Sequence, residues 1–215
     1  MQQSPWANTW VPPRSAGRSV TLEEWADLAE DEAGEWVDGQ LTEEEMPDPV
    51  HELAATWLTT LFRIWLRGRG GFVFGSEVKL RVTPTRGRKA DAMVILPGSP
   101  APPRRGLLTT PPDILVEIVT PTPRDERRDR IEKMLEYETL GVPYYWLLDP
   151  ALGTLEIFEL GPESSTVEGE PRRKYTRAIA ATEGRIDPVP GCPGLALDLD
   201  ELWADLERLV PEMYP

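Results

Sequence analysis

A short aliphatic run at residues 113–119 carries one carboxylate where a charge is costly. The run reads Asp-Ile-Leu-Val-Glu-Ile-Val and is bounded by prolines at positions 111, 112 and 121. This pattern is typical of a β-strand that is buried on both faces. Glu117 stands at its centre, and burying an ionised carboxylate is strongly unfavourable unless a cation, a metal or hydrogen bonds compensate it. We therefore expect a compensating group beside Glu117.

A second acid, Asp91, begins a similar run upstream. It is followed by Ala-Met-Val-Ile-Leu, which predicts another buried strand. Two such strands can bring two carboxylates to one point, and paired carboxylates are suitable oxygen ligands for a hard divalent cation. The alternative is structural: Asp91 only starts its strand, and Glu117 pairs with an arginine.

The motifs around these two acids occur in a recognisable order. Downstream of Glu117 the chain reads Thr-Pro-Thr-Pro-Arg-Asp at 120–125 and Gly-Val-Pro-Tyr-Tyr-Trp-Leu-Leu-Asp-Pro at 141–150. Upstream it reads Glu-Trp-Val-Asp-Gly-Gln-Leu at 35–41, His51, and Glu-Val-Lys-Leu at 77–80. Over residues 20–160 this order resembles the "putative restriction endonuclease" family of the Uma-two type, a branch of the PD-(D/E)XK nuclease superfamily.

The resemblance implies a fold and a reaction. The expected fold is α/β: a restriction-endonuclease-like (PD-(D/E)XK) core in which helices flank a central mixed β-sheet, with an N-terminal hairpin. The expected activity is that of a metal-dependent phosphodiesterase, a DNA endonuclease. In this superfamily the Asp and the Glu, here Asp91 and Glu117, bind Mg²⁺ with the help of the next backbone carbonyl, here that of Ile118. Mn²⁺ is an alternative metal. Mg²⁺ suits such a site because it accepts one or two carboxylates and keeps several waters.

The lysine of the superfamily is missing from its usual place. It normally stands two residues after the Glu, on the same strand face, but residue 119 is valine. Residue 90, where the pattern has proline, is alanine. In the resembling branch the following helix supplies the lysine, which implies that Lys133 positions the attacking water. Lys79 and Lys89 are the alternatives.

Lys133 belongs to a polar stripe on the predicted helix. Asp129 precedes it and Tyr137 follows it by four residues, so the three side chains share one helix face and the two neighbours are candidate supporting residues. The apolar residues 131, 134 and 135 point roughly the other way, which favours a solvated polar face. Tyr137 and Leu140 favour a helix that is covered on both sides. The sequence alone leaves both interpretations open.

Four further residues are candidate supporting groups. Glu77 and Lys79 alternate with apolar residues over 77–82, which predicts a strand near the site. His51 and Glu52 begin a predicted helix. His51 matches a family position from which it would contact a phosphate, and its alternative is a structural histidine at the border of an apolar stripe. Glu52 lies on the polar side of the same helix, where the alternative is a solvated residue.

The remaining patterns divide the chain into an N-terminal arm, residues 1–20, and a single domain, residues 21–215. Thr-Leu-Glu-Glu at 21–24 is a capping box that starts a short helix through about residue 29. Asp38-Gly39 marks a hairpin over 35–44. Longer helices are predicted over 49–67, over 123–140 and after Asp198, and further strands over 72–75, 144–148, 154–160 and 175–180.

The charge distribution bears on nucleic-acid binding. The formal net charge is −14, which opposes binding to phosphates, because lysines and arginines supply most nonspecific DNA affinity. Residues 1–52 contain 13 acids and two arginines, so the rest of the chain carries only −3. Basic residues gather instead at positions 86–89, 104–105, 124–133 and 172–174.

Several kinds of protein are excluded by what the chain contains. One cysteine and one histidine exclude an internal disulfide, a cysteine-based zinc cluster and a multi-histidine metal site. The sequence shows neither a signal peptide nor a run of 18 apolar residues, so we expect a cytoplasmic protein without membrane association.

Three functions are compatible with these observations. The first is the metal-dependent DNA endonuclease, for which the resemblance implies a homodimer. The second is a catalytically inactive nuclease-fold protein that acts through dimerisation or a partner; the eight tryptophans, with Trp6, Trp10 and Trp25 near the N-terminus, allow an interface there. The third is a module that binds nucleic acid without cutting it, against which the net charge argues.

Overall fold

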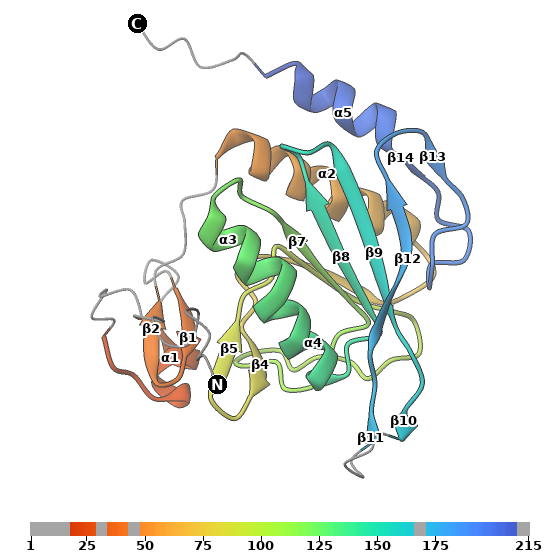
Figure 1. Ribbon diagram of the computed structural model, residues 1–215. Coiled ribbons are helices and arrows are strands. Elements are labelled where there is room, and N and C mark those ends of the chain that lie inside the picture. The colour runs from red at the N-terminus through yellow and green to blue at the C-terminus, as the bar shows by residue number, and fades with distance from the viewer. Residues whose placement is uncertain (1–17, 29–33, 43–47, 166–170, 210–215) are drawn as a thin grey trace, which may run out of the picture.

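The computed structural model describes residues 18–28, 34–42, 48–165 and 171–209 (Figure 1). Most of the predicted arm, with Trp6 and Trp10, lies outside the described residues, as does the end of the hairpin. No helix in the described ranges is both long and apolar enough to span a membrane.

A six-stranded mixed β-sheet forms the centre of the fold, as predicted (Figure 1). In the order β12-β9-β8-β7-β6-β3, its strands are Tyr175–Ala181, Thr154–Leu160, Tyr144–Asp149, Ile114–Ile118, Ala92–Ile95 and Phe72–Gly75. β7 and β8 pair parallel, whereas the other neighbours pair antiparallel. β7 is buried along its whole length, which explains its continuous apolar run, because a strand covered on both faces needs no alternation.

Helices cover both faces of this sheet (Figure 1). α2 (Pro49–Trp65) and α5 (Leu199–Glu207) share one apolar core with Ile114, Val116 and Ile118 of β7. The other face is covered by a continuous helical segment, α3–η1–α4, which consists of Pro123–Arg127, Arg128–Lys133 and Met134–Leu140. Since successive strand residues point to opposite faces, Glu117 points toward this second segment.

α2 begins where the sequence predicts. Asp48 caps it by accepting a hydrogen bond from the N–H of His51 at 2.8 Å. Phe62 of this helix packs against Trp146 of β8, with ring centroids 5.0 Å apart. This packing helps to hold α2 on the sheet, and His51 in the first turn of the helix contacts Asp91, the residue directly before β6.

A smaller antiparallel sheet lies beside the end of the α3–η1–α4 segment (Figure 1, lower left). In the order β2-β1-β5-β4, its strands are Gln40–Thr42, Glu35–Val37, Arg86–Arg88 and Leu80–Thr83. The predicted hairpin turns at Asp38 and Gly39, whose φ angles are 50° and 80°, and positive φ at both positions is typical of a type I′ turn. β5 was not predicted, because Arg-Gly-Arg carries no strand pattern.

The helix α1 (Leu22–Asp27) packs on this smaller sheet. The predicted capping box between Thr21 and Glu24 is present. The ring of Trp25 is fully buried on Gly87 of β5, and its Nε1 donates to the carbonyl oxygen of Gly34 at 3.0 Å. Four two-residue strands complete the elements: β10 Ser164–Ser165, β11 Pro171–Arg172, β13 Arg185–Ile186 and β14 Leu197–Asp198.

Two predicted elements differ from the structure. The strand expected over 77–82 begins only at Leu80, because residues 76–79 form a turn and an irregular connection. The helix expected over 123–140 contains a π-helical middle, η1. Its apolar residues Ile131 and Leu135 are 53% and 51% exposed, whereas Lys133 is buried. The polar face of the helix is therefore the one that packs against the sheet.

Candidate functional site

Asp91 and Glu117 lie beside each other on neighbouring strands. β6 and β7 pair antiparallel with Ala92 opposite Val116, so one further step along this register places Asp91 opposite Glu117. The Oδ2 atom of Asp91 accepts the N–H of Ile118 at 2.6 Å, which holds the side chain there. The N–H and the C=O of one strand residue face the same neighbour, so the carbonyl oxygen of Ile118 also faces Asp91.

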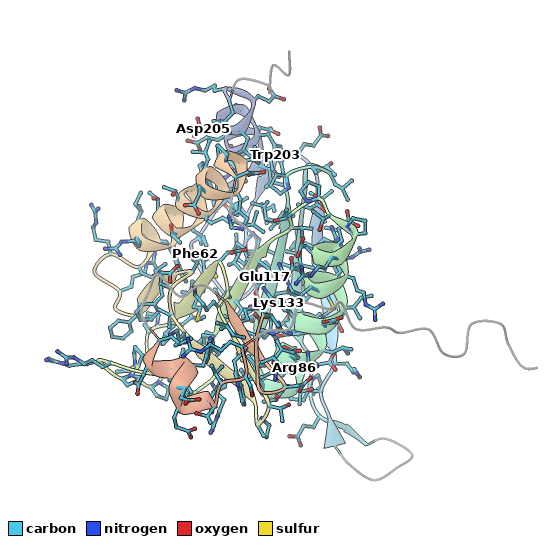
Figure 2. All side chains as sticks on the ribbon, turned by 90° about the vertical axis from the view of Figure 1, so that its left-hand side faces the viewer. Phe62, Arg86, Glu117, Lys133, Trp203 and Asp205 are labelled. Atoms are coloured by element: carbon cyan, nitrogen blue, oxygen red, sulfur yellow. The ribbon has the colours of Figure 1, made fainter. Side chains whose placement is uncertain are left out.

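Glu117 is 2% exposed, and both of its carboxylate oxygens accept hydrogen bonds. The Oε2 atom accepts one from Nζ of Lys133 at 2.8 Å, and the Oε1 atom accepts one from the hydroxyl of Tyr137 at 2.6 Å. Figure 2 shows Glu117 and Lys133 together between the sheet and the α3–η1–α4 segment. Val119 belongs to the apolar core on that face. The helix therefore brings an ammonium group to Glu117 where the strand has none.

The π-helical segment η1 aligns the polar stripe. Asp125, Asp129, Lys133 and Tyr137 are spaced four residues apart and are all buried. In an α-helix, with 3.6 residues per turn, positions four apart drift around the axis. The i→i+5 hydrogen bonding of a π-helix widens the turn and opposes this drift, so the stripe stays on one face. Such π-segments are rare and frequently occur at functional sites.

Lys133 contacts three carboxylates. Besides Glu117, its Nζ lies 3.5 Å from Oε1 of Glu35 and 3.4 Å from Oδ1 of Asp129. Burial alone would lower the pKa of Lys133, but the three carboxylates raise it above the usual value, so the ammonium group is charged at neutral pH. Burial raises the pKa of Glu117 to about 8. Lys133 opposes this shift, and the nearby carboxylates of Asp91, Asp129 and Glu35 add to it.

Glu35 and Arg88 complete the site, although the sequence interpretation assigned neither of them to it. Glu35 of β1 accepts a hydrogen bond from Nη1 of Arg88 at 2.6 Å, and Arg88 also binds both oxygens of Glu136 at 2.8 Å. Although burial opposes it, Lys133, Arg88 and Arg128 lower the pKa of Glu35 to about 2. The only sequence signal was the glutamate directly before the hairpin's Trp-Val pair.

His51 reaches Asp91 from the first turn of α2. Its Nε2 lies 3.2 Å from Oδ1 of Asp91, and its buried Nδ1 has no hydrogen-bond partner within the part of the chain that the structure describes. Burial would lower the pKa of His51, but the contact with Asp91 and the charges of Glu52 and Glu117 raise it. Glu52 is exposed, as expected for the polar side of the helix, and lines the same cavity as His51.

The structure separates the three candidate lysines. Lys133 and Lys89 line the cavity that contains the two acids, and Nζ of Lys89 lies 3.1 Å from Oε2 of the exposed Glu77. Lys79 instead donates to the carbonyl oxygens of Trp25 and Leu28 at 2.7 and 2.9 Å. Lys79 therefore ties α1 to the rest of the fold and does not reach Glu117.

These residues enclose a cavity of about 170 Å³. Carboxylates outnumber cationic side chains in its lining by six to three: Glu35, Glu52, Glu77, Asp91, Glu117 and Asp129 against Lys89, Arg128 and Lys133. Burial raises the pKa of Asp129 despite the neighbouring cations. Such an excess of negative charge around one cavity is stabilised by an added cation.

Comparison with known proteins places this chain in a family. A model of the Uma2 family, described as "Putative restriction endonuclease", matches residues 20–199. The chain belongs to the Uma2 family. The resemblance inferred from the order of the motifs is thereby confirmed, and the matched range contains Asp91, Glu117 and Lys133.

A solved structure supports the fold of this Uma2 protein. The crystal structure of a protein from Anabaena variabilis, described as a putative nuclease belonging to DUF820, matches with a TM-score of 0.64 and 18% sequence identity. The match covers 87% of this chain and 99% of the other. It confirms the predicted fold class. No curated protein matches the chain.

The donor atoms of the Uma2 site fit a hard divalent cation. Asp91, the carbonyl of Ile118 and the remaining lone pairs of Glu117 are all oxygen donors. Among the described residues, no three His, Cys, Asp or Glu side chains form a ready metal cluster. Mg²⁺ requires none, since it is usually held by one or two carboxylates plus water and substrate oxygens.

Proposed function

We propose that this Uma2 protein is a nuclease that hydrolyses phosphodiester bonds of DNA with a divalent cation held at Asp91 and Glu117. The observation that carries the proposal is the 2.8 Å contact between the buried Glu117 and Lys133, directly beside Asp91. Ionisable groups that converge on a cavity with shifted pKa values are typical of active sites. The family description, "Putative restriction endonuclease", supports the same reaction.

Asp91, Glu117 and the carbonyl oxygen of Ile118 would hold Mg²⁺ or Mn²⁺. When bound, the cation supplies charge stabilisation to the phosphate and lowers the pKa of the attacking water. Each oxygen of Glu117 keeps one acceptor position, because a carboxylate offers about four. The N–H of Ile118 and His51 each hold one oxygen of Asp91, so its carboxylate is oriented before a ligand arrives.

Lys133 acts as a donor in this proposal and not as a base. Its pKa is raised, so at neutral pH it has no free electron pair with which to take a proton from water. An ammonium group offers three N–H donors. Glu117 accepts from one at 2.8 Å, whereas Glu35 and Asp129 lie at the longer distances of 3.5 and 3.4 Å, so one of these two donors would turn to the attacking water or to negative charge on the phosphate. Glu35 and Asp129 hold the ammonium group in place, and Tyr137 holds Glu117.

Two further parts of the proposal rest on the family: DNA as the substrate and a homodimeric assembly. Light scattering of the purified full chain measures the second directly. A monomeric mass at micromolar concentration would remove the dimer from the proposal and leave the reaction unaffected.

The reaction is tested by titrating Mg²⁺ and Mn²⁺ calorimetrically into the wild type, Asp91→Ala and Glu117→Ala, followed by DNA cleavage assays. We expect metal binding and cleavage in the wild type and neither in the two variants. Glu132→Ala is the matched control, because Glu132 is a 42% exposed acid on η1, and it retains both. A wild type that takes up no metal would favour the alternative, an inactive nuclease-fold protein that acts through a partner.

A further inference from the structure

A second cavity adjoins the site. It measures about 460 Å³ and lies between the loop at 102–106 and the edge strand β3. Its polar and aromatic lining consists of Phe74, Glu77, Lys79, Lys89, Arg104 and Arg105, and we call it the basic cavity. Glu77 and Lys89 also line the cavity of the site, so the two spaces meet at this ion pair.

The two cavities carry opposite charge. Four cationic side chains line the basic cavity against one carboxylate, Glu77, whereas carboxylates outnumber cationic side chains in the cavity of the site. In a chain with a net charge of −14, this concentration of positive charge stands next to the acids that would bind a metal. A polynucleotide needs both environments, because its flanking phosphates bind lysine and arginine.

Arg104 and Arg105 are the cationic side chains with capacity to bind a ligand. Lys79 is held by backbone carbonyls and Lys89 by Glu77. Both arginines are exposed, and the residues that the structure describes offer them neither a hydrogen bond nor an ion pair. Guanidinium groups bind phosphate oxygens in a bidentate manner.

One member of a stacked aromatic pair lines the basic cavity. Phe74 lines the cavity from β3, and Phe72 stacks with it at a centroid distance of 6.2 Å and an interplanar angle of 4°. Phe72 is 43% exposed. Aromatic side chains next to cationic ones are typical of sites for single-stranded nucleic acid, in which bases stack and phosphates contact lysine or arginine.

From this arrangement we infer that the basic cavity binds a single-stranded segment next to the reacting phosphate, with Arg104 and Arg105 on its phosphates and Phe74 against a base. The inference rests on the proposed function in one respect, since the reacting phosphate is placed at Asp91. It names the substrate class: single-stranded DNA, or duplex DNA with a frayed or branched end, binds better than fully paired duplex.

Binding without a metal tests the inference separately from catalysis. The affinity of the full chain for a fluorescent single-stranded oligonucleotide is measured by anisotropy in EDTA at several salt concentrations. Replacing both arginines, R104A/R105A, lowers the slope of log K against log salt by about 1.4, because each phosphate contact on a single strand contributes about 0.7. R104K/R105K retains the slope. The control R185A/R208A, which removes two arginines that are 62% and 81% exposed, also retains it.

A separate substitution tests the inferred contact between Phe74 and a base. Phe74→Leu keeps the side chain apolar and weakens single-strand binding about tenfold with the salt slope unchanged. The inference is overturned if the wild type does not bind single-stranded DNA, if R104A/R105A leaves the slope unchanged, or if these substitutions instead dissociate a dimer formed through β3. If Asp91→Ala removes cleavage but R104A/R105A changes neither binding nor cleavage, the proposed function stands and this inference is wrong. If binding requires the two arginines but the wild type cleaves no DNA, this inference stands and the proposed function is wrong.

Discussion

The Nζ of Lys133 lies 2.8 Å from Oε2 of Glu117, and the pair joins a π-helical segment to the central strand of the sheet. Both side chains are buried. Lys133 also contacts Glu35 and Asp129. Removing the cation of such a buried cluster is costly, because the remaining carboxylates are left in an environment of low polarity. The contact therefore contributes to the stability of the fold as well as to the proposed reaction.

Replacing Lys133 by alanine should remove DNA cleavage and lower the free energy of unfolding by about 3–5 kcal/mol, as measured by urea denaturation. Lys174→Ala is the matched control. Its Nζ lies 2.7 Å from Glu138, but the lysine side chain is 59% exposed, so we expect a change below about 1 kcal/mol. If the two variants had equal free energies of unfolding, the burial of Glu117 in the fold would not require Lys133.

Tyr137→Phe removes only the hydroxyl that donates to Oε1 of Glu117. Because the carboxyl of Glu117 is mostly protonated at neutral pH, the figure for an uncharged hydrogen bond applies, about 0.5–1.5 kcal/mol, and we expect a loss of this size in urea denaturation at pH 7. Tyr144→Phe is the control, because its hydroxyl lies 3.4 Å from Glu159 at an exposed position. A loss for Tyr137→Phe no larger than that of the control would mean that water replaces the hydroxyl.

The residues of the candidate site that stand in distinctive short stretches of sequence could be predicted. An acid inside a short apolar run is visible without a structure, and this is how Asp91 and Glu117 were found. The turn at Asp38-Gly39 and the cap at Asp48 are equally local, since one or two residue types decide them. The buried strands and the longer helices follow from the same kind of pattern.

The parts that depend on contacts between distant segments could not be predicted. Glu35 and Arg88 are 53 positions apart, and nothing in either segment indicates that they meet. The rule that apolar faces are buried failed on the α3–η1–α4 segment, where Leu135 is 51% exposed and Asp129 is buried. Ion pairs satisfy that buried polar face, and they become visible only once the strands and the helix are in place.

The free energy of unfolding should depend on acid pH through the ionisation of Glu35. Its folded-state pKa is lowered to about 2 from an ordinary 4.5, so its contribution is fully present above pH 4.5 and is lost as the pH falls toward 2. The shift corresponds to about 3 kcal/mol. Glu35→Gln lacks this contribution, so its deficit relative to the wild type should shrink from about 3 kcal/mol at pH 6 toward zero at pH 2. A deficit that is constant over this range would contradict the assignment.

Metal binding should release a proton from Glu117. With its pKa raised to about 8, this carboxyl is mostly protonated at pH 7, and it must ionise to bind a cation. Calorimetry in buffers of different ionisation enthalpy should therefore report a release that approaches one proton at pH 7 and falls toward zero at pH 9. Without metal the same shift makes the contribution of Glu117 to stability decline as the pH rises from 4.5 through 8. Proton release that does not vary with pH would rule out Glu117 as the source.

Gly87→Ala should disturb the smaller sheet and, through it, the site. A Cβ at this position would lie 2.3 Å from the ring of Trp25. The ring is fully buried and hydrogen-bonded to Gly34, so it has no room to move. Overpacking of this kind costs about 1–3 kcal/mol. Because Gly87 pairs with Trp36 next to Glu35 and precedes Arg88, the same change should displace the carboxylate that holds Lys133 and lower DNA cleavage as well.

Gly75→Ala separates this effect from the general cost of altering a strand glycine. Gly75 ends β3, and a Cβ there would meet no atom within 4 Å. We expect its unfolding free energy to stay within about 0.5 kcal/mol of the wild type. If Gly87→Ala is as stable and as active as Gly75→Ala, the smaller sheet tolerates displacement of Trp25, and the position of Glu35 does not depend on that packing. If Gly87→Ala loses both stability and cleavage, the hairpin layer helps to position Lys133 through Glu35.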